Sequence, residues 1–397
     1  MSTKKLKRIS VIMLAAALCL SAVGCSKAED ESGSAAATTR AAPSAVASNA
    51  VSTTLLDTSQ LFSDRDLKQA VELTNAVRMK LESNQDVTLD QEGVYVISGE
   101  AHNATVVVDA AKDAKVQIVL DGVSITNEDS PAIYVKAADK VFVTSTSSEN
   151  HMTVYGNYTA DGSTNLDAVI FSRADLVLNG TGTLDIVSNE GNGISSKDDL
   201  TITGGTYTIH SSADAIEAND SILIHDGTVS IDSDKDALHS ENDEDDTLGY
   251  IYMEGGTLNI TAANNAIRAN RFVQIDGGII NIESCKEGIE ANVVKINDGQ
   301  IKMFAMDDGI NASFKVKSNV VIEVNGGTID VRMDSGDTDA FDSNGDIYIN
   351  GGTIRIEASS AFDADGTAQL IGGDVTVNGE KITEITQSHP GGRGKRA

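Results

Sequence analysis

Hydrophobic and polar residues alternate in short runs through most of the chain, and Gly-Gly or Asp-Gly pairs separate these runs. Residues 206–209, 222–224 and 273–275 are examples. Alternation with a period of two is typical of β-strands, and glycine supplies positive φ for turns without steric cost. The pattern therefore predicts an all-β chain with almost no helix.

A six-residue motif, called the repeat motif below, occurs ten times. Its copies begin at Pro131, Asp167, Asn192, Asp214, Asp236, Asn265, Glu287, Asp308, Asp339 and Ser360. From Gly193 to Ala361 its second position recurs after 22, 22, 29, 22, 21, 31 and 21 residues, a period typical of solenoids. Three short strands and two or three bends fill one such repeat, and coils stacked at roughly 4.8 Å form a parallel β-helix. We predict a single-stranded parallel β-helix of about 11 coils over residues 55–379, with an irregular N-terminal cap at residues 55–81 that covers the first coil.

The motif also predicts which side chains lie inside. Position three is Ile, Leu, Val or Phe in all ten copies, and position five is usually small. Strand alternation places these two positions inside and positions two, four and six outside. Position two is Ala or Gly in every copy, so we expect a bare strip on the outer surface, flanked by polar columns.

The N-terminal residues indicate export. Residues 1–24 contain four cations, an apolar run and then small residues directly before Cys25, which resembles the lipobox of bacterial lipoproteins. We expect lipidation of Cys25 and a location on the extracellular face of the bacterial cell membrane; a simple signal peptide is the alternative. Residues 25–54, rich in Ala, Ser and Thr, predict a flexible tether, and residues 380–397 predict a loose tail that ends in basic residues.

The charge balance excludes some partners. The formal net charge is -29, and loss of the four cations in residues 1–24 would make it -33. Such an acidic chain is not expected to bind nucleic acid, whereas cations are expected partners. Cys285 is the one cysteine of the predicted domain, so we expect a buried core residue, no disulfide and a monomer.

Several segments resemble the clostridial-type carbohydrate-binding β-helix family. They are residues 119–127 (VLDGVSITN), 130–142 (SPAIYVKAADKVF), 248–257 (LGYIYMEGGT) and 62–66 (FSDRD). The resemblance covers about residues 55–379. It implies a right-handed parallel β-helix like that of pectate lyases, bound calcium, and binding of cellulosic and pectic polysaccharides without cleavage.

Carboxylates recur at position one of the motif and would lie one strand spacing apart in adjacent coils. The candidate metal ligands are Asp214, Asp236, Glu287, Asp308, Asp339 and Asp342. Like charges at this distance repel by roughly 1 kcal/mol in water, and Ca²⁺ takes six to eight oxygen ligands. We therefore expect calcium on this column; the alternative is that Asp and Asn cap turns and keep the chain soluble.

Positions four and six supply the candidate carbohydrate ligands, which are Glu217, His239, Arg268, Glu290, Asn270 and Asn292. A long groove of charged donors and acceptors suits a linear polysaccharide. A cross-coil salt-bridge ladder is the alternative reading of Arg268. The chain has no Trp, which weighs against stacking on crystalline cellulose.

These features predict a lipid-anchored surface protein that binds plant cell-wall polysaccharide, pectate or cellulose, with calcium and without cleavage. A calcium-dependent pectate lyase is the first alternative, because Lys235, Lys286 or Arg268 could act as the base beside the metal. A structural spacer or adhesin on the cell surface is the second.

Overall fold

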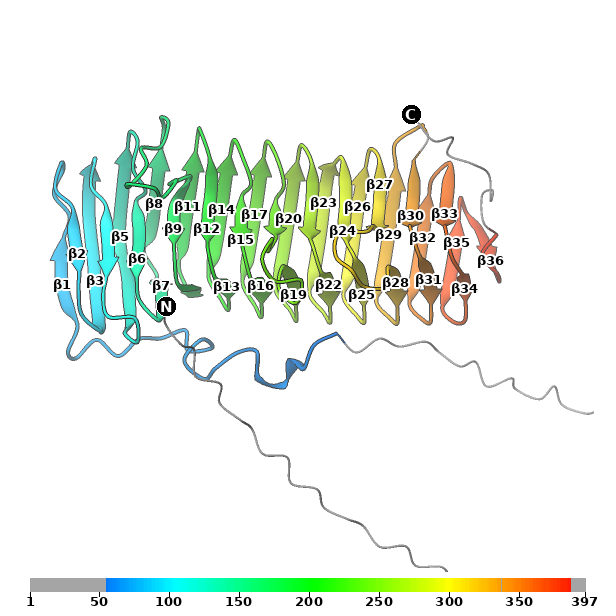
Figure 1. Ribbon diagram of the computed structural model, residues 1–397, viewed down its shortest axis with the longest axis horizontal. Helices are drawn as coiled ribbons and strands as arrows, with labels where there is room; N and C mark the ends of the chain where they lie inside the picture. The colour runs from blue at the N-terminus through cyan, green and yellow to red at the C-terminus, as the bar shows by residue number, and fades with distance from the viewer. Residues whose placement is uncertain (1–54, 337, 387–397) are drawn as a thin grey trace, which may run out of the picture. The chain divides into compact units, whose positions relative to one another are not determined.

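Residues 55–336 and 338–386 are described by the computed structural model, in which 36 strands stack side by side along one axis (Figure 1). Within these ranges the strands pair in parallel, except that β35 and β36 pair antiparallel. The helix content of this part is one 3₁₀ turn, η1 (Thr58–Gln60). The predicted all-β parallel solenoid is therefore confirmed. No helix in the described ranges has the length and apolar character needed to cross a membrane.

The repeat motif forms one complete face of the solenoid, called the motif sheet below. Its strands are β2 (Val87–Leu89), β4 (Val106–Asp109), β6 (Ile133–Ala137), β9 (Ala168–Ser172), β12 (Asn192–Ser196), β15 (Ile216–Ala218), β18 (Leu238–Ser240), β21 (Asn265–Ala269), β24 (Glu287–Ala291), β27 (Asp308–Ala312), β30 (Asp339–Ser343) and β33 (Ser360–Ala364). The ten copies become β6 to β33, and identical motif positions are paired, as in Ile216 with Leu238 and Leu238 with Ile267. One motif strand per coil gives 12 coils, against the predicted number of about 11.

The other strands form a 24-stranded sheet that bends into two faces. The second face consists of β1 (Val77–Lys80), β3 (Gly93–His102), β5 (Lys115–Asn127), β7 (Lys140–Ser145), β10 (Asp175–Gly180), β13 (Asp199–Ile202), β16 (Ser221–Ile224), β19 (Tyr250–Met253), β22 (Phe272–Ile275), β25 (Val293–Ile296), β28 (Val321–Val324), β31 (Asp346–Ile349) and β34 (Ala368–Leu370). The third face consists of β8 (Glu149–Val154), β11 (Thr183–Ser188), β14 (Thr206–Ser211), β17 (Thr228–Ser233), β20 (Thr257–Ala262), β23 (Ile279–Cys285), β26 (Gln300–Ala305), β29 (Thr328–Met333), β32 (Thr353–Glu357), β35 (Asp374–Val377) and β36 (Glu380–Ile382). The long strand β5 pairs with both β7 and β8, so it joins the two faces.

The glycine pairs lie at the bend between the second and third faces, as predicted. Gly256 has a φ of 81°, and a Cβ at this residue would lie 2.8 Å from the carbonyl oxygen of Gly227 in the preceding coil. Only glycine combines that φ with so close an approach of the stacked backbone. The turn glycines therefore allow the coils to stack in register.

The core follows the predicted positions three and five. Ile216, Leu238 and Ile267 are at most 1% exposed, and small residues such as Ala218 and Ala269 lie beside them. Cys285 is also buried, in agreement with the expected core role. The alternation of a large and a small residue fills each layer of the core.

Position two lies inside the molecule, so the expected bare outer strip does not exist. Ala215 and Ala340 are fully buried. A Cβ at Gly309 would lie 2.6 Å from the carbonyl oxygen of Ala340 and 2.8 Å from Cγ1 of Val331. At position two the chain turns from the third face into the motif sheet. The backbone of the next coil and the core side chains lie so close there that only Ala or Gly fits.

Residues 55–76 lie along the second face, whereas the sequence predicted that this segment would cover the first coil. The outward side chains of Phe142, Val177, Leu223 and Tyr252 on this face are buried. Phe62 packs beside Tyr252, with the ring centroids 6.3 Å apart, and the guanidinium of Arg65 lies 4.5 Å from the Phe142 centroid. Gln69 accepts a hydrogen bond from the backbone N–H of Gly180 at 2.7 Å. The segment therefore covers an apolar outer surface of the second face, along the middle coils of the solenoid.

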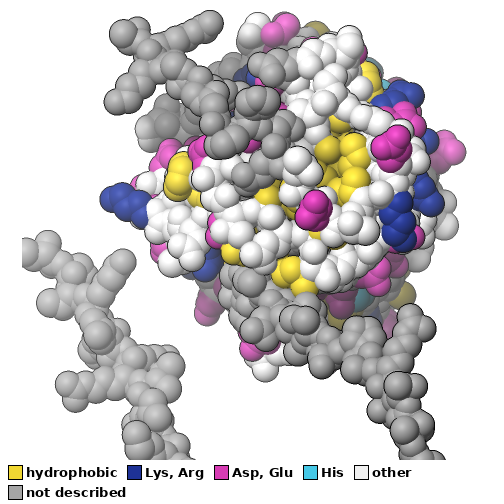
Figure 2. Space-filling view, turned by 90° about the vertical axis from the view of Figure 1, so that its right-hand side faces the viewer, with side chains coloured by type: hydrophobic (Ala, Val, Ile, Leu, Met, Phe, Trp, Pro, Cys, Tyr) yellow, Lys and Arg dark blue, Asp and Glu magenta, His cyan; other side chains and the backbone are white. Residues whose placement is uncertain are grey.

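The C-terminal end of the solenoid is closed by a short antiparallel return. β36 folds back on β35, three residues beyond the predicted domain end at 379. Figure 2 looks onto this end and shows hydrophobic side chains among polar ones. Leu370, Val377, Ile382 and Ile385 are partly buried against the core here. The predicted signal sequence, Cys25, the tether and the basic residues at the end of the tail lie outside the described residues.

Candidate functional site

The position-one residues connect successive coils through their side chains. Asn192, Asp214, Asp236 and Asp308 each accept the backbone N–H of the next position-one residue, at 3.0, 3.1, 2.9 and 3.4 Å. One side-chain oxygen of each residue therefore satisfies a backbone donor at the bend, as expected for Asp and Asn in turns. The other oxygen of each Asp contacts a side chain, which is His239 for Asp214, Arg268 for Asp236 and Asn311 for Asp308.

His239 neutralises the N-terminal half of this column. Its Nδ1 lies 2.9 Å from Oδ2 of Asp214, and its Nε2 lies 2.9 Å from Oε2 of Glu241. Burial lowers the pKa of His239, but the hydrogen bond and charge of Asp214 outweigh it, so that the pKa lies above the ordinary value. Burial alone would raise the pKa of Asp214, but the hydrogen bond and charge of His239 leave this pKa below the ordinary value. Both ring nitrogens can donate when the ring is charged, so this arrangement fits an imidazolium between two carboxylates.

Arg268 extends the same network along the sheet. Its guanidinium lies 3.5 Å from Asp236 and 3.4 Å from Glu241. Its Nε lies 3.8 Å from Oε2 of Glu290. The salt-bridge ladder that was the alternative reading of this residue is therefore present in the structure. Asp214, Asp236, His239, Arg268 and Glu290 form what we call the paired network.

The remaining candidate carbohydrate ligands support loops or neighbouring coils. Asn292 is fully buried and donates to Oγ of Ser318 at 2.7 Å and to the carbonyl of Asn319 at 2.8 Å. Glu290 accepts from Ser313 at 2.9 Å and pairs with Lys315 at 2.5 Å. Both residues therefore hold the loop of residues 313–320.

Glu217 and Asn270 also have partners inside the protein. Glu217 accepts a hydrogen bond from Asn192 at 2.6 Å and pairs with Lys197 at 3.4 Å. Asn270 is 9% exposed. Burial raises the pKa of Glu241, but hydrogen bonds from His239 and Asn270 leave it below the ordinary value.

Two loops rise from the bend between the motif sheet and the second face, where the repeats of 29 and 31 residues carry their extra length. The loop of residues 241–249 overhangs a hollow of about 620 Å³ lined by Glu217, His239 and Asp220, among others. A second hollow of about 620 Å³ lies between Asp246 and residues 314–319. Phe314, which the sequence analysis did not single out, is 69% exposed here. The structure thus brings Glu217 and His239 to one hollow, whereas Asn292 is enclosed under the second loop.

In the C-terminal half of the acidic column, burial and neighbouring carboxylates raise the pKa values of Glu287 and Asp308. The β27 cluster, as we name it, consists of Glu287, Asp307, Asp308, Asn311, Asp339 and Asp342. Burial, followed by the charges of Asp342, Asp307 and Glu287, raises the pKa of Asp308 to about 7. Lys286 lies 3.7 Å from Glu287 and 3.6 Å from Asp307, and its side chain is 51% exposed.

Asn311 adds an amide group to the β27 cluster. Its Nδ2 lies 3.4 Å from Oε2 of Glu287 and 3.3 Å from Oδ2 of Asp308. Its Oδ1 is buried and has no hydrogen-bond partner, although the residue is only 8% exposed. Register pairs Asp308 with Asp339 and Asn311 with Asp342. Carboxylate and amide oxygens from adjacent coils are the donors that Ca²⁺ prefers.

A second carboxylate group was missed from the sequence. This group consists of Asp175, Asp198 and Asp199, and one oxygen of each lies within 4.8 Å of the others. In the paired network, one oxygen each of Asp214 and Asp236 and a ring nitrogen of His239 lie equally close together. Burial raises the pKa of Asp175 to about 6, partly offset by Lys140 at 3.5 Å. These carboxylates meet because β10 and β13 pair in register, which brings residues 24 positions apart together. Aligning the coils on the second strand, and not only on the motif, would have revealed them.

The sequence model of the carbohydrate-binding domain-containing protein family matches residues 83–340. This is more than half of the chain. The chain belongs to this family. The match includes the paired network and ends within β30, so most of the β27 cluster lies inside it, and residues 55–76 lie outside.

A carbohydrate-binding domain-containing protein of Acetivibrio thermocellus is 43% identical over 188 residues, which are 47% of this chain and 66% of that protein. The chain therefore spans just under two thirds of this relative. A solved structure described as a polysaccharide lyase-like protein from C. thermocellum is 21% identical, with 76% of this chain and 96% of that chain covered and a TM-score of 0.33. A TM-score this low does not establish a shared fold. The fold of this carbohydrate-binding domain is assigned from its own strand pairing.

Proposed function

We propose that this carbohydrate-binding domain holds an acidic plant cell-wall polysaccharide such as pectate through calcium bound at the β27 cluster, without cleaving it. The supporting observation is the contrast between the two halves of the acidic column. Asp214 pairs with His239, and its pKa is lowered despite burial, whereas burial and the charges of Asp342, Asp307 and Glu287 raise the pKa of Asp308 to about 7.

Calcium is needed on electrostatic grounds. The chain carries a formal net charge of -29, so a polyuronate would be repelled by the protein alone. Burial and the nearby carboxylates raise the pKa of Asp308, and a cation held by Glu287, Asp308 and Asp342 would offset the repulsion between these groups. Its open coordination positions could take sugar carboxylates. The free Oδ1 of Asn311 would supply a neutral ligand.

The residues around the β27 cluster favour binding without cleavage over a lyase reaction. A lyase needs a strong base beside the metal. Arg268 is engaged by three carboxylates, and Lys235 lies on an exposed turn of the N-terminal half. Lys286 is the remaining candidate at the β27 cluster, and it is the residue to replace in a test of the lyase alternative.

We also propose that the domain is displayed on the outer face of the bacterial membrane through lipidated Cys25. The sequence pattern of residues 1–25 supports this proposal. Loss of membrane association in Cys25→Ser, with unchanged folding of the released domain, is the expected result. Membrane association that survives in Cys25→Ser would exclude the lipid anchor.

The central test is retention of polygalacturonate and of a neutral glucan on immobilised protein, in calcium and in chelator. We expect polygalacturonate to be retained only in calcium, with no rise in the ultraviolet absorbance of unsaturated lyase products. Asp308→Asn should weaken this retention about tenfold or more, since a charged ligand contact is worth about 1.5–3 kcal/mol. Asp234→Asn, which removes an exposed carboxylate elsewhere, is the matched control.

Three other outcomes are distinguishable. Rising absorbance that is lost in Lys286→Ala would make the protein a lyase. Retention of polygalacturonate that is equal in calcium and in chelator would remove calcium from the proposal. If neither glycan is retained in either buffer, the spacer or adhesin function would replace it.

A further inference from the structure

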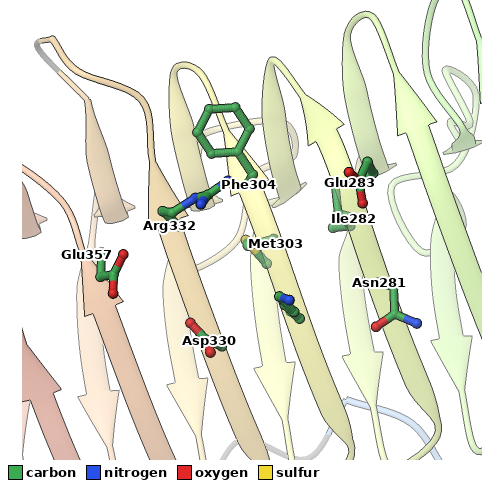
Figure 3. A pocket seen from close by; sticks show the side chains of 9 residues that line it. Asn281, Ile282, Glu283, Met303, Phe304, Asp330, Arg332 and Glu357 are labelled. Carbon is green, nitrogen blue, oxygen red and sulfur yellow. The ribbon is translucent and has the colours of Figure 1, made fainter.

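A groove runs along the third face, on a different side of the solenoid from the motif sheet. Its larger part is a hollow of about 530 Å³ over β23, β26, β29 and β32, and Figure 3 shows side chains from these neighbouring strands around it. Its lining residues are Asn281, Ile282, Glu283, Lys302, Met303, Phe304, Asp330, Arg332 and Glu357. A hollow of about 240 Å³ over β14, β17 and β20 shares Asn281 and Glu283 with it. The two are therefore continuous over seven coils, roughly 29 Å at a strand spacing of about 4.8 Å.

In the smaller hollow, Asp232 lies 3.6 Å from His210, whereas the charged side chains of the larger hollow have no ion-pair partners among the described residues. Glu283, Lys302, Arg332 and Glu357 are exposed, and none makes a salt bridge within 4 Å. The same is true of Arg355, the exposed register neighbour of Asp330. Exposed polar groups without internal partners are free to exchange their water for a ligand.

Charges of opposite sign alternate along the groove. Register places Lys302 beside Asp330 and Asp330 beside Arg355. The same pairing places Arg332 beside Glu357. With Asp232, Glu283 and the neighbouring Arg355, four acidic and three basic residues nearly cancel, although the chain as a whole carries a net charge of -29. A polyanion gains no net attraction from such a surface, whereas hydroxyl groups can donate to the carboxylates and accept from the cations.

The rest of the lining consists of hydrogen-bonding side chains and one aromatic ring. Asn281 donates to Oδ1 of Asn259 at 3.0 Å, and Asn259 donates to Oγ of Ser230 at 3.4 Å, so that an amide and hydroxyl row crosses three coils. Phe304 is half-buried, and the guanidinium of Arg332 lies 4.9 Å from its centroid. An aromatic ring beside such a row offers an apolar surface for the C–H face of a sugar.

We infer that this groove is a second glycan-binding site, which takes a neutral linear polysaccharide lying along the solenoid axis without calcium. The alternating charges hold its hydroxyl groups, and Phe304 contacts one sugar ring. The site is separate from the β27 cluster, and its existence does not depend on the calcium-dependent binding proposed above.

The test uses the full chain in chelator and a soluble hexasaccharide of β-1,4-linked glucose, with titration calorimetry as the measurement. We expect binding by the wild-type protein and a loss of about tenfold in affinity in Arg332→Ala and in Phe304→Ala. Glu357→Gln retains the shape of the side chain and removes one charged acceptor, so a smaller loss is expected. Gln300→Ala changes an exposed residue of β26 outside the groove and should bind like the wild type.

Melting curves of every variant identify any that fail to fold, and the three groove variants together keep the test independent of one substitution. Equal affinity of the groove variants and the wild type would overturn the proposal, as would the absence of hexasaccharide binding in chelator. Stronger binding of polygalacturonate than of the neutral hexasaccharide in chelator would overturn the inferred ligand class. Failure of the calcium-dependent retention alone would affect the β27 cluster and leave this inference standing.

Discussion

Residues at the same motif position can have different electrostatic surroundings. Asp214 and Asp308, both at position one, illustrate the difference. Both carboxylates accept a backbone N–H of the next coil. Asp214 faces His239, and its pKa is lowered despite burial; Asp308 faces other carboxylates, and burial together with their charges raises its pKa to about 7. Burial raises the pKa at both residues, so the charged neighbours, and not the motif position, decide the direction of the shift.

Asp308 leads to a prediction of pH dependence. Because its pKa is raised from 3.8 to about 7 by folding, the stability that its protonated form contributes is present below about pH 4 and is lost as the pH rises through 7. In chelator, Asp308→Asn should therefore melt at a higher temperature than the wild type at about pH 8 and at a similar temperature near pH 4. Thermal melts across this range measure the difference. A difference that does not change with pH would contradict the prediction, and Asp234→Asn is the control.

At the scale of elements, residues 55–76 and the second face depend on each other. The sheet carries outward apolar side chains, and the segment carries the residues that cover them. The buried carboxylate of Asp66 lies 3.5 Å from Lys140, which also pairs with Asp175, so the segment is held by polar contacts as well. A sheet surface of this kind would otherwise be exposed and prone to association.

Replacing Phe62 tests this packing. Phe62→Ser removes a half-buried ring from His225 and Tyr252, with centroids 5.1 and 6.3 Å away, and should cost about 1–2 kcal/mol in the free energy of unfolding. Leu67→Ser lies in the same segment at a residue 37% exposed, and it should change stability by less than about 0.5 kcal/mol. Denaturant titrations of both variants provide the comparison. Equal effects would show that the segment does not stabilise the sheet through Phe62.

The whole molecule combines a high net charge with local ion pairs. Repulsion summed over a net charge of -29 destabilises the folded chain, whereas the partly buried network around His239 and Arg268 is screened little by salt. Raising sodium chloride from about 0.1 M to about 1 M shortens the Debye length from about 10 to about 3 Å. In chelator we therefore expect the melting temperature to rise with salt. A fall would show that the ion pairs outweigh the net repulsion.

The sequence by itself determined the solenoid, its bends and the interior of the motif. Each coil repeats the same local pattern, and parallel stacking places like positions together, so that Ile216 and Ala218 could be assigned to the core without knowledge of the rest of the chain. The same stacking made it possible to predict the acidic column at position one. Local alternation and glycine turns carry this information because they act within one repeat.

Only the tertiary structure decided which charges pair and which surfaces stay open. Arg268 reaches carboxylates in two neighbouring coils, and Asn311 leaves an oxygen unpaired; both depend on side-chain geometry across strands. Position two was placed outside by simple alternation but is inside, because the bend rotates the chain. The covering of Tyr252 by Phe62 joins residues 190 positions apart, and no repeat period contains such a contact. The third-face groove likewise arises from seven separate strands, whose side chains become one surface only when the coils stack.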